Sequence, residues 1–345
     1  MTTKARAAHK PTADTEIEIL RAASFERIPW LVHGFSTRNG GDSKLYGGAA
    51  LNLGFTQHDS RPAVERNRRR FISALTQQVG QRASRRPAHG DWSLVTLRQI
   101  HSDIIHCISE IPKEHLAGDG LITNRPGILL GVLAADCLPV ILVDPKRRAV
   151  GVFHAGWRGT LKRIVEKGAG EMHRWFGTKA SDLRAAIGPG IRGCCYQVGP
   201  ELRAKFESQF AYSDALFRET KERNEVHEKY PLLFLTARAP GHSELPKKIF
   251  LDLAEANRRQ LMAAGVSSKN ISDVGFCTSC RTDLFFSHRA EKGITGRMMA
   301  AVGSRRGINQ SDCRQDVRRT PNPPRPALSL SASQRRPGAQ VFAQR

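Results

Sequence analysis

The sequence lacks several features that would assign it to common classes. Asp136 and Pro139 interrupt its central apolar run, which is too short to cross a bilayer. The N-terminal stretch has no apolar segment typical of a secretory signal, so we expect a cytoplasmic protein with reduced thiols. None of its 12 histidines forms a His-x-His pair, which argues against a laccase-type copper cluster. A second CxxC and any repeat of 20 to 50 residues are also missing, which argues against a zinc ribbon and a repeat array.

Positive charge is abundant, at a net +22, but it is spread over separate segments. The tail 304–345 carries +7, and further clusters occupy the expected helix 61–70 and the loop 81–90. Neither cluster has the interleaved aromatic residues that stack nucleic-acid bases. We therefore expect solvated surface with weak, salt-sensitive polyanion contacts and no specific nucleic-acid partner. A non-enzymatic nucleic-acid binder that depends on the tail remains the alternative.

The segment 127–160 concentrates the chemistry of the chain. Its apolar runs predict two buried strands joined by a short turn, and Asp136, Cys137 and His154 fall where such strands end or bend. His101 follows another short apolar strand, 93–97. A His-Cys-His set of three ligands with one open position is the catalytic arrangement of zinc. The same residues also fit ordinary buried packing, or a metal-free hydrolase in which Cys137 is the nucleophile and a histidine its base.

Four sequence blocks, ADCLPV, HAGWRGT, AAIGPGIRGCCYQV and GITGRMMA, resemble one family. It is the purine nucleoside phosphorylase family formerly called polyphenol oxidase or laccase-domain proteins, and the resemblance runs from about residue 30 to 303. It implies a single α/β domain (mixed α+β), with mixed β-sheets layered against helices. It also implies a Zn²⁺ site formed by His101, Cys137 and His154.

The implied activity is phosphorolysis of adenosine, inosine, guanosine and 5′-methylthioadenosine, together with deamination of adenosine. The implied partners are therefore purine nucleosides and phosphate. Copper in the same ligand set, and thus a phenol oxidase, is the less favoured alternative. A cysteine-dependent hydrolase, for example one that edits peptidoglycan precursors, is another alternative.

Other polar residues are candidates for the site. Asp136 can assist proton transfer, hydrogen-bond a purine nitrogen or orient a ligand. Arg38 and Asn52 lie in expected loops, and Arg158 offers a donor fork for phosphate at the start of an expected helix 160–176. His288 is a further candidate for substrate binding. Asp119 is interpreted as a turn residue.

The chain is expected to have three parts. Residues 1–24 are expected to form a flexible arm. Residues 25–303 are expected to form the catalytic domain, with a surface insertion at 211–247. Residues 304–345 are expected to be a disordered basic tail rich in Pro, Ser and Arg. The vicinal Cys194-Cys195 pair and the CxxC of Cys277 and Cys280 are interpreted as reduced, packed thiols. Asp252 is expected to cap a helix that stops at Gly265.

Overall fold

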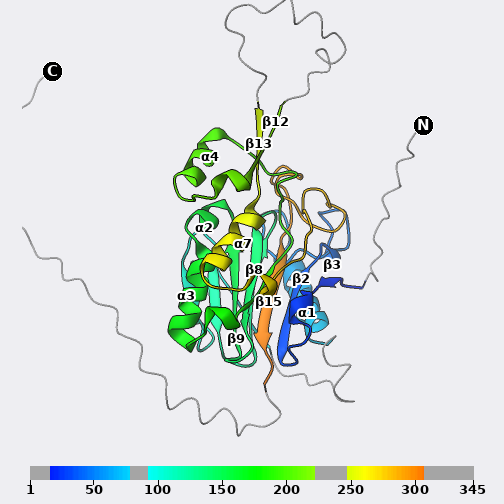
Figure 1. Cartoon of the computed structure of the whole chain (residues 1–345). Helices are drawn as coiled ribbons and strands as arrows, with labels where there is room; N and C mark the ends of the chain where they lie inside the picture. The colour runs from blue at the N-terminus through cyan, green and yellow to red at the C-terminus, as the bar shows by residue number, and fades with distance from the viewer. Residues whose placement is uncertain (1–15, 78–91, 222–246, 307–345) are drawn as a thin grey trace, which may run out of the picture. The chain divides into compact units, whose positions relative to one another are not determined.

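Three β-sheets and their covering helices make up residues 16–77, 92–221 and 247–306, which the computed structural model describes (Figure 1). The α-helices are α1 (Arg61–Gln77), α2 (Trp157–Leu161), α3 (Ile164–Phe176), α4 (Pro200–Glu207) and α7 (Leu253–Ala263). Short 3₁₀ turns are η1 (Ala23–Phe25), η2 (Ala180–Asp182), η3 (Ser213–Leu216) and η4 (Ser268–Asn270). The first strands are β1 (Ile19–Leu20), β2 (Leu31–Ser36), β3 (Asn39–Ser43), β4 (Ser93–Thr96), β5 (Ile105–Cys107), β6 (Gly120–Thr123), β7 (Ile128–Ala134) and β8 (Leu138–Asp144). The others are β9 (Ala149–Ala155), β10 (Arg184–Ile187), β11 (Gln197–Val198), β12 (Phe217–Lys221), β13 (Lys247–Leu251), β14 (Ile271–Asp273) and β15 (Met298–Ser304).

Two large sheets pack face to face. One has the order β1-β2-β15-β7-β4 and the other β14-β10-β8-β9-β6-β5, and both mix parallel and antiparallel pairs. Helices α3 and α7 pack on the second sheet, whereas α1 packs on β2 and β3 beside the first. In Figure 1 α2 and α3 lie on the left of the strands and α1 on the right. These layers form a single domain and confirm the expected α/β class with mixed sheets and flanking helices.

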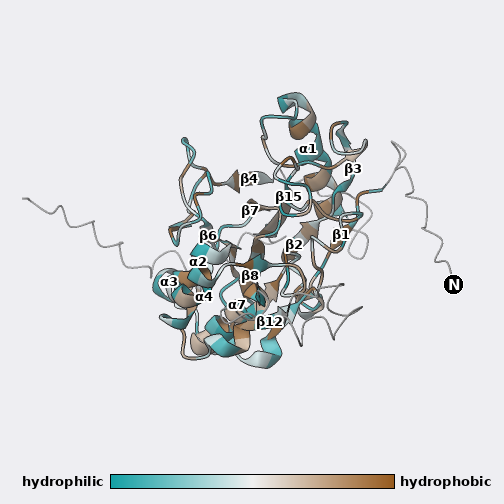
Figure 2. Cartoon of the chain, turned by 90° about the horizontal axis from the view of Figure 1, so that it is seen from above, coloured by the Kyte–Doolittle hydropathy of each residue, from teal (hydrophilic) through white to brown (hydrophobic). Residues whose placement is uncertain are grey.

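Strand β8 shows why its sequence is apolar throughout. Leu138, Val140 and Leu142 pack in the cluster that lies toward α3 and α7. Ile141 and Val143 belong to the cluster between the two sheets. Because successive strand side chains point to opposite faces, a strand covered on both faces is apolar at every position. Figure 2 shows the same distribution, with hydrophobic colour on central strands and more hydrophilic colour on the outer helices.

The segment 127–160 contains three strands, which corrects the prediction of two. The apolar run 128–143, expected as one strand, is divided into two. It forms β7 of the five-stranded sheet and β8 of the six-stranded sheet, and residues 135–137 carry the chain from one sheet to the other. Asp136 has a positive φ of 88° at this crossing. The segment 149–155 then adds the third strand, β9. The crossing places Asp136 and Cys137 at strand ends.

Two predicted helices are present, and one of them differs in detail. The expected helix 160–176 is split, because Arg163 adopts a left-handed conformation between α2 and α3. The helix α7 confirms its prediction: Asp252 Oδ1 accepts hydrogen bonds from the amides of Ala254 and Glu255, and Gly265 has a φ of 93°.

Two of the expected segment boundaries need correction. Residues 16–24 are not a loose arm, because Ile19 and Leu20 pair with β2 and Ile17 is buried. Residues 213–221 form η3 and β12, and Leu216 is buried in the core, so this part of the expected insertion belongs to the domain. Residues 1–15, 78–91, 222–246 and 307–345 lie outside the described part of the chain, as do the expected loop 81–90 and nearly all of the expected tail.

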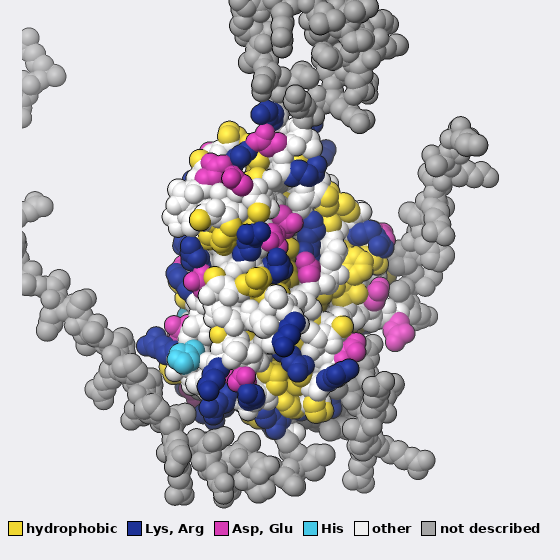
Figure 3. Space-filling view, in the orientation of Figure 1, with side chains coloured by type: hydrophobic (Ala, Val, Ile, Leu, Met, Phe, Trp, Pro, Cys, Tyr) yellow, Lys and Arg dark blue, Asp and Glu magenta, His cyan; other side chains and the backbone are white. Residues whose placement is uncertain are grey.

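Three basic residues of α1, Arg66, Arg68 and Arg70, contact other groups of the domain. Arg66 and Arg70 both form ion pairs with Asp42, and Arg68 donates to the Leu53 carbonyl while lying 4.4 Å from the centre of the Phe55 ring. On the face shown in Figure 3, Lys and Arg side chains are scattered among acidic and apolar ones. Among the described residues, no helix has the length and apolar content that crossing a bilayer requires.

Candidate metal centre

Three strand ends bring His101, Cys137 and His154 together. His101 lies in the loop after β4, Cys137 at the crossing between β7 and β8, and His154 near the end of β9. Their ligand atoms all lie within 4.8 Å of one another, and Cys137 Sγ is 3.9 Å from His101 Nε2. His154 is buried, Cys137 is half-buried and His101 is exposed, so the cluster opens to solvent on one side. Two imidazoles and one thiolate are suitable donors for zinc or another borderline-soft dication.

Asp119 supports this arrangement by hydrogen bonds to His154 and to the backbone of the His101 loop. Its Oδ1 accepts from His154 Nδ1 at 2.9 Å and from the His101 amide at 3.1 Å. Its Oδ2 accepts from the amides of Ile100 and Ser102 and from the Ser102 hydroxyl. Because Nδ1 of His154 donates to the carboxylate, Nε2 is the nitrogen left with a lone pair for a metal. Asp119 therefore not only holds a backbone turn, as expected, but also orients the ring of His154.

The charges of the three ligands are coupled. Burial raises the pKa of the Cys137 thiol, but the neighbouring His154 and His101 rings outweigh it and lower this pKa to about 6. Burial lowers the pKa of His154, yet Cys137 and Asp119 raise it to about 9. Burial likewise raises the pKa of Asp119, but hydrogen bonds from His154 and Ser102 lower it to about 2. Without a metal, these groups hold a thiolate beside an imidazolium at neutral pH, and a dication can take the place of the proton.

Gly156 makes room for the cluster. A Cβ at this position would lie 2.8 Å from Cys137 Sγ and 3.4 Å from His101 Cδ2. Any larger residue would therefore push against two ligands. This gives a physical reason for the glycine in the HAGWRGT block.

The three ligands line one wall of a cavity of about 810 Å³. This volume lies in the usual range of small-molecule sites, about 300–1,000 Å³. Apolar lining comes from residues such as Leu97, Leu133 and Ile191. The remaining lining includes aromatic and basic side chains, namely Phe55, His58, Trp157, Tyr196, His288, Arg289 and Arg297. Such a mixture suits a ligand with a flat ring and polar or anionic groups.

Asp136 also lines the cavity, but its carboxylate is already engaged. Oδ1 accepts from the hydroxyls of Thr278 and Ser287, both at 2.7 Å, and Oδ2 accepts from the Arg289 amide at 2.6 Å. The carboxylate thus ties the crossing that carries Cys137 to the loop that carries Arg289. These bonds indicate that Asp136 positions two walls of the cavity.

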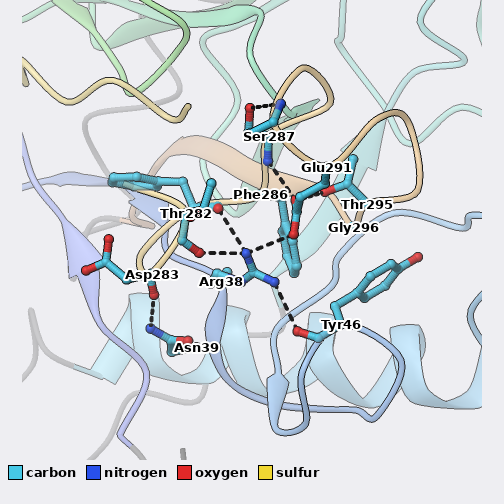
Figure 4. Close-up of polar contacts among 12 residues, drawn as sticks. Arg38, Asn39, Tyr46, Thr282, Asp283, Phe286, Ser287, Glu291, Thr295 and Gly296 are labelled. Carbon is cyan, nitrogen blue, oxygen red and sulfur yellow. Dashed lines mark hydrogen bonds and ion pairs between the residues drawn. The ribbon is translucent and has the colours of Figure 1, made fainter. Parts of the chain in front are cut away.

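Arg38 does not reach the cavity, which corrects the expectation that it contacts substrate. Its guanidinium donates to the carbonyls of Thr282, Phe285 and Tyr46 and forms an ion pair with Glu291 at 3.0 Å (Figure 4). It also lies 4.7 Å from the centre of the Phe286 ring. Arg38 therefore fastens the loop 282–291 to the N-terminal part of the domain.

Asn52 and Arg158 also lie outside the cavity lining, whereas His288 is part of it. Asn52 is fully buried and accepts from the amide of Arg297, so it anchors a lining residue indirectly. Arg158 is exposed and lies 4.3 Å from the centre of the Trp157 ring. The expected phosphate contact of Arg158 stays a prediction, with its guanidinium stacked on a residue that lines the cavity.

Three residues of the cavity lining, Tyr196, Arg289 and Arg297, have no clear signal in the sequence. The glycines and proline of the segment 183–199 were the available signal for Tyr196, since they indicate backbone that passes close to another group. Arg289 and Arg297 both lie in the long loop between β14 and β15, and Arg297 is its last residue. No local pattern distinguishes them from surface arginines.

A two-histidine, one-cysteine centre in a cavity of a layered α/β domain defines a candidate metalloenzyme. Residues 32–305 match the family described as multi-copper polyphenol oxidoreductase laccase, and the chain belongs to that family. It is 36% identical over 279 residues to purine nucleoside phosphorylase YlmD of Geobacillus stearothermophilus, covering 79% of this chain and 90% of that protein.

Two further comparisons agree with this assignment. Adenosine deaminase RL5, from an unknown prokaryotic organism, is 34% identical over 219 residues, which are 61% of this chain and 74% of that protein. The crystal structure of the hypothetical protein YfiH of Bacillus licheniformis superposes with a TM-score of 0.68 at 30% identity, covering 85% of this chain and 98% of that one. The names of the relatives support a nucleoside-processing enzyme.

Proposed function

We propose that this protein is a zinc-dependent purine nucleoside phosphorylase that also deaminates adenosine. The observation that carries the proposal is the His101, Cys137 and His154 set, backed by Asp119, on the wall of a cavity large enough for a nucleoside. Three protein ligands with a carboxylate behind one histidine fit a catalytic zinc site. Adenosine, inosine, guanosine and 5′-methylthioadenosine are the proposed nucleosides.

The metal would be held by Nε2 of both histidines and by the Cys137 thiolate. Bound there, Zn²⁺ supplies Lewis acidity toward a substrate oxygen or water. A multi-copper phenol oxidase fits the proposal less well, because its copper cluster is built from many histidines, and the candidate ligand groups of the described residues contain only two, His101 and His154.

The cavity offers side chains for phosphorolysis. In that reaction a phosphate oxygen bonds to ribose C1′ while the bond from C1′ to the base nitrogen breaks, and its electron pair passes to the purine. We assign Arg289 and Arg297, the two arginines of the lining, to hold the phosphate. Both arginines are held by bonds from Nη1: Arg289 donates to the Gln197 carbonyl, and Arg297 donates to the carbonyls of Thr295 and Gly296.

Tyr196 is assigned to the base. Burial raises the pKa of this phenol to about 12, so it keeps its proton at neutral pH and can donate a hydrogen bond to a purine nitrogen. His288, exposed at the cavity, is a second contact for the nucleoside. For deamination, a water oxygen bonds to C6 of adenine and the C6–N bond breaks, which releases ammonia.

Adenosine conversion with and without phosphate tests the proposal. Zinc-quantified protein should produce adenine and ribose 1-phosphate only when phosphate is present, and inosine in both samples. Cys137→Ala should lose both products, whereas Cys107→Ala, a matched change in β5 outside the cavity lining, should keep them. Absence of all products from folded, zinc-loaded protein would overturn the proposal.

A further inference from the structure

Four cysteines gather at a second place in the fold. Cys194 and Cys195 belong to the turn after β10, and Cys277 and Cys280 to the loop after β14. Their sulfur atoms all lie within 4.8 Å of one another. Cys280 Sγ lies 3.5 Å from that of Cys194 and 3.3 Å from that of Cys195.

These distances suit a shared metal ion better than a disulfide or core packing. All four cysteines are free, and a disulfide would need sulfurs about 2.05 Å apart. Four thiolates at about 2.3 Å from a tetrahedral zinc lie roughly 3.8 Å from one another. Cys194 and Cys280 are exposed and Cys195 is half-buried, whereas a cysteine that serves only as packing is usually buried. The expectation that Cys194 and Cys195 are packed thiols is therefore wrong for the exposed Cys194 and only partly met by Cys195.

The closeness of the four thiols suits a cation. Cys280 Sγ lies within 3.5 Å of the sulfurs of both vicinal cysteines. Four adjacent sulfurs cannot all become thiolates unless a positive charge lies among them. A dication supplies that charge and releases the protons.

We propose that Cys194, Cys195, Cys277 and Cys280 bind one Zn²⁺ as a closed tetrahedral site with a structural role. Four sulfur ligands leave no open position for substrate, in contrast to the three-ligand centre. This second site does not depend on the proposed nucleoside activity.

The site would fasten two loops that line the cavity. The first loop carries Ile191 and Tyr196, and the second carries His288 and Arg289. Existing links between them are the parallel bridge of Gly190 with Cys277 and the bonds of Arg192 to the Phe276 carbonyl and to Asp273. A zinc ion beside these links would fix the spacing between Tyr196 and Arg289.

Metal stoichiometry tests the proposal. The full chain, purified with a thiol reductant and dialysed against buffered Zn²⁺, should contain two zinc ions by elemental analysis and native mass spectrometry. Cys280→Ala should contain one, Cys137→Ala should contain one, and the double variant none. Cys107→Ala, which changes a cysteine outside both clusters, should contain two.

Spectroscopy of the cobalt-loaded chain separates the two sites further. Cys137→Ala loaded with Co²⁺ should keep the intense thiolate-to-cobalt absorption and the visible bands of a four-sulfur tetrahedral site. If Cys280→Ala fails to fold, this spectrum and the zinc count of Cys137→Ala still decide the matter.

A wild-type chain with one zinc that is lost in Cys137→Ala would overturn the second site. So would a Cys280→Ala chain that keeps two. Because both readouts count metal, they give the same answer whether or not the protein converts nucleosides.

Discussion

Asp119→Asn is the change that most directly tests the construction of the metal centre. The carboxylate accepts five hydrogen bonds, two at Oδ1 and three at Oδ2. An asparagine has one acceptor oxygen, and its least costly orientation puts that oxygen at the three donors. Its NH₂ group then faces the His101 amide and Nδ1 of His154. His154 must give up the proton on Nδ1 and protonate Nε2, which removes the lone pair needed by the metal.

Two magnitudes follow from this geometry. Loss of the carboxylate behind a metal-binding histidine typically lowers metal affinity by about 10- to 100-fold. The His101 amide loses its hydrogen-bond acceptor, which adds about 1–3 kcal/mol of destabilisation. In the metal-free protein the pKa of Asp119 is lowered to about 2, so its ionised form adds stability on the order of 2 kcal/mol. Since the folded pKa is below the ordinary value, this stability is present above about pH 4 and is lost as pH falls toward 2.

The assay compares zinc affinity and thermal stability in parallel. Competition with a chromophoric chelator should show the predicted loss of zinc affinity at the three-ligand centre, and calorimetry should show a lower Tm. Asp103→Asn is the matched control, because Asp103 lies in the same loop but pairs only with the exposed Lys162 and Lys167. An Asp119→Asn protein with lower Tm and wild-type zinc affinity would refute the tautomer argument, since it would leave Asp119 a purely structural role.

Three further predictions concern the ligands and the cavity. Gly156→Ala should lose zinc from the three-ligand centre and about 1–3 kcal/mol of stability, because its Cβ would overlap Cys137 Sγ. Gly170→Ala, which meets no atom within 4 Å, should lose neither, and equal zinc content in the two variants would refute the steric argument. In zinc-stripped protein, iodoacetamide should modify Cys137 with a midpoint near pH 6, whereas Cys107, whose pKa burial raises to about 11, should stay unmodified there; equal reactivity by peptide mass spectrometry would contradict this. Arg297→Gln should raise the KM for phosphate by about 10-fold or more while the KM for adenosine changes little, and an unchanged phosphate KM in steady-state kinetics would remove Arg297 from the phosphate site.

The three metal ligands at strand ends can be predicted from the sequence more readily than the residues that surround them. His101, Cys137 and His154 each follow or end an apolar strand, and strand ends of packed sheets meet in space. The chain crossing at residues 135–137 was harder to foresee, because continuous apolar character is the same for one long strand and for two strands in different sheets. Asp119 looks like a turn residue in the sequence, since its partners in the His101 loop lie 17 to 19 residues away and no local pattern reveals them.

Contacts between distant segments explain the remaining differences. Arg38 looks like a loop residue free to bind a ligand, but it bonds to carbonyls and a carboxylate about 250 residues further along the chain. The vicinal cysteines and the CxxC look like two unrelated pairs in the sequence. They meet only because β10 and β14 are parallel neighbours, which places the loops after both strands at the same edge. Such pairings depend on sheet topology, which local periodicity does not determine.

The dependence of nucleoside conversion on zinc at the three-ligand centre is the measurement that tests the central claim most directly. The chain is stripped with a chelator, Zn²⁺ is returned in steps, and adenosine products in the presence of phosphate are quantified by chromatography. Product formation should be lost in the stripped protein, recover in proportion to zinc regained, and stay absent in Cys137→Ala at every zinc concentration. Full activity in the zinc-free protein, or recovery in Cys137→Ala, would contradict a zinc centre built from His101, Cys137 and His154.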